Sequence, residues 1–352
     1  MTSGPTVRGR ATIMDVARAA EVSRQTVSNV VNQPGRVAAQ TLERVNREIT
    51  RLGFRPSRAA RNLKQERAGA WGVELNSTGM GRQGSILDTF LVHLTTRSRR
   101  HDAHIVPFTA PDHEEPIPAY EDLFASRIAD GFVLTDTRHA DPRPQWLRDN
   151  GIPFASFGRI WDDPSYTAWV DVDGAAGVEA AVRHVAANGF ERIGFLGWPP
   201  GSPVGDDRRM GWSRATADLG LERAAWQATS AQELTAASAA ARPLVDGLGR
   251  GAAIVCASDV LAVGAWVVLT ERGWRVGTDF AIVGFDDTDL AATLRLSSIR
   301  QPLDDAADRV LDLLGGEPGE GVDAHAGRGS GLLLPPELVI RASSSPAGDR
   351  TT

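Results

Sequence analysis

Apolar positions near the start of the chain recur at helical spacing and predict three short helices, the third from about residue 40 to 52. The three apolar groups are Ile13, Val16, Ala17 and Ala20, then Val27, Val30 and Val31, and last Leu42, Val45, Ile49 and Leu52. Thr12 and Asp15 have the spacing of a capping box before the first helix. Ser23 is a good N-cap for the second helix, and Gly53 ends the third.

From residue 70 onward the pattern changes to short apolar runs that alternate with amphipathic segments. The runs predict strands at Ala70–Leu75, Ala103–Phe108, Gly131–Thr135, Pro153–Phe157, Arg192–Gly197, Ala252–Ala257 and Ala281–Phe285. The amphipathic segments lie near 85–100, 119–129, 174–188, 207–219, 233–248 and 259–272. This alternation indicates an α/β fold with parallel, doubly wound sheets. Ligands of such sheets bind beyond the carboxyl ends of the strands.

Composition narrows the classes to consider. At 352 residues the chain is long enough for two or three domains, and 42% hydrophobic residues suffice for a substantial core. No apolar run approaches the roughly 18 residues that span a membrane, and the N-terminus has no apolar signal-peptide segment. Cys256 is the only cysteine, so we expect neither a disulfide framework nor a cysteine metal cluster. We expect a cytoplasmic protein with no cofactor, metal or membrane partner.

The net charge of −6 conceals a strong asymmetry between the two ends of the chain. Residues 1–67 carry 13 basic and 5 acidic side chains, a net of +8, which leaves −14 for the remainder. A basic head on an acidic body indicates that only the head meets a polyanion such as the phosphate backbone of DNA. The second predicted helix leaves Arg24, Gln25, Ser28 and Asn29 facing outward. Two short helices with such side chains on the second fit a helix-turn-helix, because Arg and Gln can each pair with base edges.

These residues also carry a resemblance to a known family. The stretches TIMDVARAAEVSRQTVSNVVN and VAAQTLERVNREITRLGFRPSRAARNLKQ closely resemble the N-terminal region of LacI/GalR-type bacterial transcription regulators. The resemblance implies a helix-turn-helix domain over residues 11–56 that binds double-stranded operator DNA. The DNA-binding residues that it implies in this domain are Thr12, Ser23, Arg24, Gln25, Thr26, Ser28, Asn29 and Arg36. Among them, Arg24, Gln25 and Asn29 occupy the main base-reading positions.

Three residues of the head depart from the family pattern. Asn29 replaces a common Arg, so we expect a different operator preference. Glu21 replaces the usual turn Gly, where a positive φ costs about 1 kcal/mol for other residues. Ala38 replaces a Ser N-cap and gives up about 1 kcal/mol of capping.

Residues 57–67 are short, basic and rich in small side chains, and they resemble the hinge helix of the family. Such a segment is too short to form a stable helix alone, and in the family it folds when two copies pair over the minor groove. The resemblance implies DNA contacts for Arg58, Ala60, Leu63 and Lys64, with Leu63 inserted at the central base step. The alternative for Leu63 is ordinary packing.

The body resembles the two-lobed, periplasmic-binding-protein-like core of the same family. VDVDGAAGVEAAVRHVAANGFERIGFLG and GTDFAIVGFDDTDLA are among the stretches that match. The resemblance implies a ligand-binding and dimerisation core over 68–346. Its first lobe would take about 68–170 and 300–328, and its second about 171–299 and 329–346. The chain would pass between the lobes near 168–172, 298–302 and 325–331.

Most candidate ligand contacts follow the predicted strands, and the resemblance implies ligand contact near Asn76 and at Arg208. The candidates are Asn76, Arg159, Trp161, Trp198, Arg208, Ser258, Asp259 and Asp286. Arg208 and Asp286 suit a polyol, because a carboxylate accepts from adjacent hydroxyls and a guanidinium donates to oxygen. Salt bridges between the lobes are the alternative for these two residues and for Arg159, and helix capping is the alternative for Asp259. The two tryptophans either stack on a sugar ring or pack between loops.

The sequence therefore predicts a homodimeric regulator, a repressor of carbohydrate-utilisation genes that a mono- or disaccharide releases from a palindromic operator. The tail after Arg341 has no leucine heptads, which favours a dimer without a tetramerisation helix. Corepression of the purine-repressor type stays open. An enzyme lacks support, because no H-E-x-x-H, G-x-S-x-G or Walker A motif occurs. A solute-binding protein would need a signal peptide and would leave the basic head unexplained.

Overall fold

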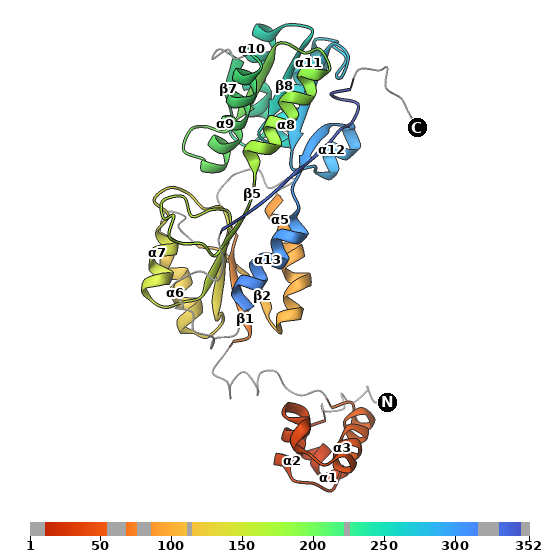
Figure 1. Cartoon of the computed structure of the whole chain (residues 1–352). Coiled ribbons are helices and arrows are strands. Elements are labelled where there is room, and N and C mark those ends of the chain that lie inside the picture. The colour runs from red at the N-terminus through yellow and green to blue at the C-terminus, as the bar shows by residue number, and fades with distance from the viewer. Residues whose placement is uncertain are drawn as a thin grey trace, which may run out of the picture. The chain divides into compact units, whose positions relative to one another are not determined.

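The computed structural model describes residues 11–54, 68–75, 86–110, 115–221, 226–315 and 331–345 (Figure 1). The chain divides between Ala68 and Gly69 into two compact units, which are described separately below. The expected hinge helix at 57–67 and the glycine-rich stretch that precedes residue 331 lie outside the described residues.

The first unit is a small helical domain, as the apolar pattern predicts. It contains α1 (Ile13–Ala19), α2 (Arg24–Asn32), the 3₁₀ turn η1 (Pro34–Arg36) and α3 (Ala39–Leu52). One apolar cluster holds the helices together, and its innermost side chains are Val16, Ala20, Val27 and Val45. Phe54 covers this cluster after α3 ends at Gly53, whose φ of 62° is the expected left-handed cap.

The first lobe of the second unit is built on a six-stranded parallel sheet in the order β11-β5-β4-β3-β1-β2. Its strands are β1 (Ala70–Glu74), β2 (His104–Phe108), β3 (Gly131–Leu134), β4 (Phe154–Phe157), β5 (Trp169–Val172) and β11 (Leu332–Leu334). Helices α5 (Ile86–Arg97) and α13 (Leu303–Gly315) lie side by side on one face (Figure 1). Helices α6 (Ile117–Ala125) and α7 (Pro142–Asp149) cover the other.

The second lobe repeats this plan with the order β12-β10-β9-β8-β6-β7. Its strands are β6 (Ile193–Gly197), β7 (Gln227–Thr229), β8 (Ala252–Cys256), β9 (Phe280–Phe285), β10 (Ser297–Arg300) and β12 (Glu337–Val339). Its helices are α8 (Gly174–Ala187), α9 (Pro203–Asp218), α10 (Leu234–Leu248), α11 (Asp259–Glu271) and α12 (Asp289–Leu294). Helix α8 packs on α9, and α10 packs on α11. The edge strand β12 is antiparallel to β10, which departs from the expected parallel pairing.

Three segments connect the lobes. The chain leaves the first sheet after β5, returns between β10 and α13, and leaves again between β11 and β12 at Pro335-Pro336. The first two connections lie close to their predicted positions. The third was expected near 325–331 and lies later, because Leu332–Leu334 still pair with β5 in the first sheet. Strand β11 therefore belongs to the first lobe. The expectation that residues 329–346 lie in the second lobe is wrong for this strand.

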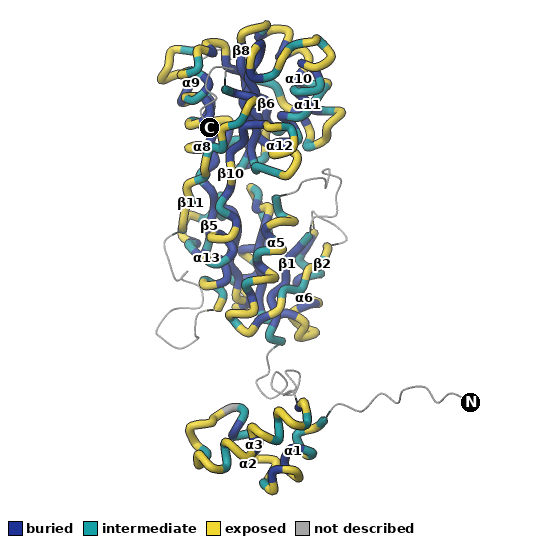
Figure 2. The backbone as a smooth tube through the Cα atoms, turned by 90° about the vertical axis from the view of Figure 1, so that its right-hand side faces the viewer, coloured by how far each residue is buried: buried dark blue, intermediate teal, exposed yellow. Residues whose placement is uncertain are grey.

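Burial explains which strands the apolar pattern could reveal. All seven predicted strands are present, and central ones such as β8 and β9 are buried along their whole length (Figure 2). A strand covered on both faces reads as a continuous apolar run. The strands missed are β5, β7, β10, β11 and β12, which have three or four residues each and mostly lie toward the sheet edges. Among the described residues, no helix is both long and apolar enough to pass through a bilayer.

The contact between α10 and α11 depends on Gly264, and this gives a test of the packing. A Cβ at this position would lie 2.5 Å from the Cβ of Ala237 and 2.8 Å from its carbonyl carbon. We predict that Gly264→Ala lowers the free energy of unfolding by about 1–3 kcal/mol, because the two helices must move apart. Urea denaturation of the purified protein measures the change.

Gly247 in α10 is the matched control, since a Cβ there meets nothing within 4 Å. Gly247→Ala should leave stability unchanged or raise it by up to about 1 kcal/mol through helix propensity. Equal midpoints for the two alanine variants would contradict the close contact at Gly264.

Candidate functional site

The start of the helical head is held by reciprocal hydrogen bonds. The backbone N–H of Asp15 donates to Oγ1 of Thr12 at 3.3 Å, and the N–H of Thr12 donates to Oδ2 of Asp15 at 2.9 Å. This is the predicted capping box, and it closes the first turn of α1. Thr12 and its neighbours therefore have a structural role that is independent of DNA.

The turn between α1 and α2 has the strained conformation that the sequence departure predicts. Glu21 has a φ of 51°, in the left-handed region where the family's glycine is relaxed. Ser23 then starts α2, because its Oγ accepts a hydrogen bond from the N–H of Thr26 at 3.0 Å. Ala38 starts α3 without any side-chain cap, as expected.

Helix α2 presents a polar face opposite its buried valines. Arg24 and Gln25 are exposed, while Ser28 and Asn29 are half-buried beside Val27. Nε2 of Gln25 donates to Oδ1 of Asn29 at 3.0 Å, so the amide groups one turn apart form a pair. Such a pair presents hydrogen-bonding groups at the surface and fixes their orientation. Side chains that read base edges need groups oriented in this way.

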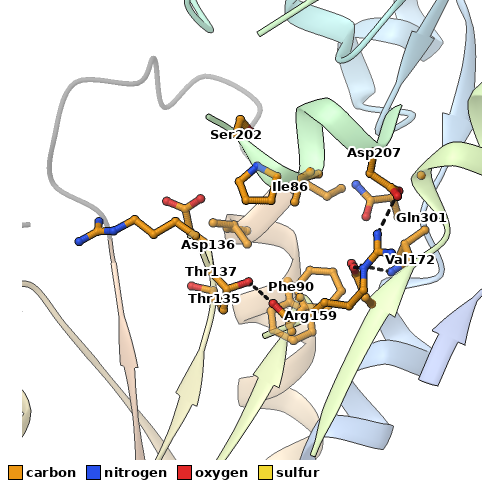
Figure 3. Close-up of a pocket in the computed structure, with 18 of the residues that line it drawn as sticks. Ile86, Phe90, Thr135, Asp136, Thr137, Arg159, Val172, Ser202, Asp207 and Gln301 are labelled. Carbon is orange, nitrogen blue, oxygen red and sulfur yellow. Dashed lines mark hydrogen bonds and ion pairs between the residues drawn. The ribbon is translucent and has the colours of Figure 1, made fainter. Parts of the chain in front are cut away.

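The second unit contains a cavity of about 570 Å³ between its lobes, called the interlobe cavity here (Figure 3). The first lobe contributes side chains from β1, α5 and the segments that follow β3, β4 and β5. The second lobe contributes the segments after β6, β7 and β9, the start of α9, and Gln301 after β10. The cavity thus lies at the carboxyl ends of the parallel strands, where side chains from several loops meet.

One part of the first-lobe wall, formed by α5 and β1, is mostly apolar. Ile86, Leu87, Phe90 and Leu91 face the cavity from α5, and Val73 adds to them from β1. The adjacent Glu74 is buried, and its Oε2 accepts hydrogen bonds from Tyr120 and Arg143 on the helices of the opposite sheet face.

The wall from the second lobe contains the buried guanidinium of Arg208. Its Cζ lies 3.6 Å from the ring centre of Phe285 and 5.1 Å from that of Trp198, which are cation–π distances. Its Nη1 donates to the carbonyl oxygen of Ala257 at 2.5 Å, and Nε has no hydrogen-bond partner among the described residues. Burial lowers the pKa of Arg208, and Asp286 opposes that shift.

Asp286 lies beside this arginine. Its Oδ1 is 3.9 Å from Nη2 of Arg208 and accepts a hydrogen bond from Nε2 of Gln301 at 2.7 Å. Burial raises the pKa of Asp286 to about 7, although the charge of Arg208 acts in the opposite direction. Both members of the pair belong to the second lobe, so the alternative of a salt bridge between the lobes does not apply to them.

Arg159 does connect the lobes. Its Nε contacts Oδ2 of Asp171 at 2.7 Å in the first lobe, and its Nη2 contacts Oδ2 of Asp207 on α9 at 3.0 Å in the second (Figure 3). The same Oδ2 of Asp207 accepts from the N–H of Ala175 at 3.1 Å. Arg159 therefore joins the two walls through carboxylates at the cavity.

Four of the predicted ligand contacts line the cavity, namely Arg159, Trp198, Arg208 and Asp286. Asn76 lies outside the described residues. Trp161 lines a separate hollow of about 310 Å³ beside Thr137 and Arg138, and the guanidinium of Arg159 covers its ring at 4.3 Å. The prediction of Trp161 in the main cavity is therefore wrong, because the loop after β4 turns its ring toward α7.

The structure also corrects Ser258 and Asp259. Oγ of Ser258 caps α11 and donates to Gln232, which itself lines the cavity, so Ser258 supports a lining residue from behind. Asp259 is buried and accepts hydrogen bonds from Thr288 and from Ser298. The helix cap is Ser258 and not Asp259, which leaves neither residue in the cavity.

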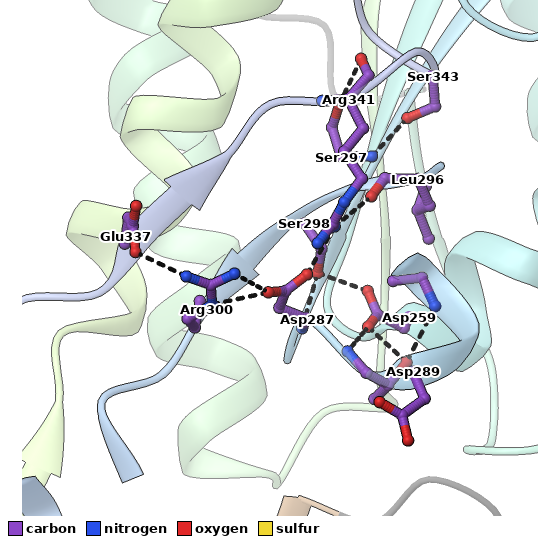
Figure 4. A network of polar contacts seen from close by, with 12 residues as sticks. Asp259, Asp287, Asp289, Leu296, Ser297, Ser298, Arg300, Glu337, Arg341 and Ser343 are labelled. Atoms are coloured by element: carbon purple, nitrogen blue, oxygen red, sulfur yellow. Dashed lines mark hydrogen bonds and ion pairs between the residues drawn. The ribbon is translucent and has the colours of Figure 1, made fainter. Parts of the chain in front are cut away.

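A polar network around Asp287, the residue that follows Asp286, holds the loop that carries both residues (Figure 4). Asp286 and Asp287 have φ values of 107° and 50°, which few residues other than glycine adopt. Asp287 forms ion pairs with Arg300 on β10 at 2.7 Å and with Arg341 beyond β12 at 2.6 Å. Arg300 also contacts Glu337 on β12 at 3.1 Å. The strained loop is thus attached to two strands that lead to or from the first lobe.

Several lining residues escaped the sequence analysis. They are Asp171, Asp207, Gln232 and Gln301. Asp207 carried a usable signal, because it starts a predicted helix next to Arg208, and Asp171 lies in the predicted connection near 168–172. Gln232 and Gln301 gave no such signal in the sequence, because only the pairing of distant segments brings them to the cavity.

A helix-turn-helix head joined to a two-lobed α/β core with a cavity between the lobes defines a class of ligand-responsive DNA-binding proteins. The model for bacterial regulatory proteins of the lacI family matches residues 12–57, and the periplasmic binding protein-like domain matches residues 182–344. The HTH-type transcriptional regulator CelR of Thermobifida fusca is 30% identical over 350 residues, which cover 96% of this chain and 99% of the relative. The chain belongs to the LacI family of transcriptional regulators, and its relatives are DNA-binding regulators, not enzymes.

Solved structures agree with this assignment. A LacI-family regulatory protein from Chloroflexus aggregans has a TM-score of 0.70 at 33% identity and covers 79% of this chain and 99% of its own. The complex of the regulator CelR with cellobiose has a TM-score of 0.68 at 26% identity and covers 95% of this chain and 100% of its own. The fold of the chain thus matches that of regulators with known structures.

The raised pKa of Asp286 predicts a pH dependence of stability. The folded-state pKa lies above the unfolded value, so the stability contribution is complete below about pH 4 and is lost as pH rises through about 7. We expect wild type to lose up to about 1.4 kcal/mol per pH unit relative to Asp286→Asn between pH 4 and 7. Urea denaturation of both proteins at several pH values measures the difference. Parallel stability curves would show that Asp286 titrates normally.

Proposed function

We propose that the protein is a sugar-responsive repressor that leaves its operator when a saccharide binds in the interlobe cavity. The observation that carries the proposal is the pairing of Arg208 with Asp286 beneath the ring of Trp198. Asp286 supplies an acceptor for sugar hydroxyls, and Arg208 supplies donors for hydroxyl or ring oxygens. The aromatic ring offers an apolar face at the same place, which suits the C–H face of a pyranose.

The volume of the cavity supports a small-molecule ligand. About 570 Å³ falls in the range of sites that enclose most of a drug-sized ligand. The similarity to a regulator crystallised with cellobiose favours a saccharide over other small molecules. The apolar α5 wall would contact the less polar side of such a ligand.

The head supplies the DNA contacts in this proposal. Arg24, Gln25 and Asn29 on the exposed face of α2 would enter the major groove, with Ser23, Thr26, Ser28 and Arg36 near phosphates. Two copies of the chain would bind the two halves of a palindromic operator as a homodimer. The hinge residues Arg58, Ala60, Leu63 and Lys64 would enter the minor groove between them, with Leu63 wedged into the central step.

Ligand and operator would then oppose each other through the lobes. A saccharide that contacts Asp286 and Arg208 favours one relative placement of the lobes, which changes the separation of the hinge segments in the dimer. The coupling is reciprocal, so operator DNA weakens saccharide binding by the same factor. A thermal-shift screen of mono- and disaccharides tests the ligand class, since a ligand at 100 times its Kd adds about 2.7 kcal/mol. Stabilisation by purines alone would overturn the sugar assignment.

A substitution at Arg208 can distinguish the response to ligand from DNA binding. We predict that Arg208→Ala keeps operator affinity and loses more than about tenfold in saccharide affinity, because a charged donor is removed from the cavity. Fluorescence anisotropy of labelled operator, titrated with the saccharide, measures both quantities.

Arg209→Ala is the matched control for this variant. Arg209 is the next residue on α9, half-exposed and paired with Asp206 at 3.5 Å outside the cavity. It should respond to saccharide as wild type does. A normal response by Arg208→Ala would remove Arg208 from the ligand site.

Asn29 determines base preference in this proposal. Asn29→Arg should shift the preferred base at one or two symmetric operator positions, since one good side-chain–base pair discriminates by about 1–3 kcal/mol. Selection of binding sites from a random DNA pool measures the preference. Asn46→Arg on the exposed surface of α3 adds the same charge to the head and should raise affinity for all sequences without a new preference. The same selected sites for wild type and Asn29→Arg would mean that residue 29 reads no base.

A further inference from the structure

The charged groups of the interlobe cavity limit what kind of ligand it can accept. Among the described residues that line it are three arginines and six acidic residues. The arginines are Arg138, Arg159 and Arg208, and the acidic residues are Glu74, Asp88, Asp136, Asp171, Asp207 and Asp286. The described wall therefore carries more carboxylates than guanidinium groups.

The positive charge of Arg159 is already paired with two carboxylates. Two of its nitrogens contact Asp171 at 2.7 Å and Asp207 at 3.0 Å, so one guanidinium faces two carboxylates. These acidic side chains are only 11% and 10% exposed, which keeps water from screening them. Burial raises the pKa of Asp171, and the neighbouring charge of Asp207 adds to that rise. Binding of a negatively charged ligand is therefore unfavourable in this part of the cavity.

Arg208 also lies beside a carboxylate. Its planar group lies against the ring of Phe285, its Nη1 donates to the carbonyl oxygen of Ala257, and its charge is opposed by Asp286. An anionic ligand at Arg208 would lie next to the Asp286 carboxylate. Glu74 does not alter the balance, because Arg143 and Tyr120 already bind it.

We propose that the interlobe cavity selects an uncharged saccharide and rejects the phosphorylated and uronate forms of the same sugar. The proposal rests on the sugar-responsive function and narrows its ligand class. A neutral sugar offers hydroxyl donors to the carboxylates and needs no cation. A phosphate or carboxylate must lose its hydration beside Asp171, Asp207 and Asp286, while Arg159 already faces two of these carboxylates and Arg208 lies beside the third.

Asp207 is the specificity-determining residue in this account. Its replacement by Asn removes one negative charge and keeps the shape and an oxygen that can accept from the N–H of Ala175. Arg159 would then face Asp171 alone and could contact an anion. We expect Asp207→Asn to gain at least about tenfold in affinity for sugar phosphates or uronates over wild type.

Asp206→Asn is the matched control. Asp206 is adjacent on α9, its side chain is 41% exposed, and it does not line the cavity. The variant removes the same charge from the same helix. It should behave as wild type toward every ligand, so a gain confined to Asp207→Asn reports on the cavity and not on net charge.

Isothermal titration calorimetry on the full chain provides the test. The probes are glucose, galactose and cellobiose, then glucose 6-phosphate, galactose 6-phosphate, glucuronate and inorganic phosphate. We expect neutral sugars alone to bind wild type, and anions to bind Asp207→Asn. Operator binding by each variant shows that it is folded.

The outcomes separate this proposal from the function on which it rests. Binding of a sugar phosphate or uronate to wild type at least as tightly as its neutral parent would overturn the selection against anions. Failure of every anion to gain affinity in Asp207→Asn would overturn the role of Asp207. If no neutral sugar binds wild type while Asp207→Asn gains inorganic phosphate binding, the charge barrier is supported and the sugar-responsive function fails.

Discussion

The two lobes meet around the half-buried charge of Arg159, which carboxylates from both sides compensate. Arg159 takes one carboxylate from each lobe, Asp171 and Asp207, and so requires both walls of the cavity to be present. A half-buried guanidinium without such partners would lose part of its hydration without compensation. The relative placement of the lobes, the shape of the cavity and the charge that a ligand meets there all depend on this contact.

A second constraint links the cavity to the connections between the lobes. Asp286 faces the cavity, and its neighbour Asp287 faces the strands that lead to and from the first lobe. Both have positive φ, and Arg300 and Arg341 hold the loop in this conformation together with Ser298 and Gln301. A ligand that moves Asp286 therefore acts on the same loop that Arg300 and Arg341 hold. This gives the core a physical route from ligand contact to lobe movement.

The local features of the head could be predicted because neighbouring residues determine them. The capping box of Thr12 and Asp15, the cap at Ser23 and the left-handed Gly53 each depend on atoms within four residues. The strained turn at Glu21 was recognisable for the same reason. Long buried strands such as β8 and β9 were also recognisable, since burial on both faces leaves an uninterrupted apolar run.

Features that depend on distant pairing were not predictable. Strand β11 pairs with β5 across more than 150 residues, and only that pairing places the third connection at Pro335-Pro336. Trp161 was misplaced because a strand end locates a loop but not the direction of its side chains. Ser258 and Asp259 were misplaced because Gln232, Thr288 and Ser298 reach them from other segments. The sequence by itself determined the helical head, the alternating core and the place of Asp286 after a predicted strand through local spacing, and the family resemblance pointed to Arg208. Only the tertiary structure decided that Asp171 and Asp207 pair with Arg159, because the partners of a half-buried charge come from segments that meet in space.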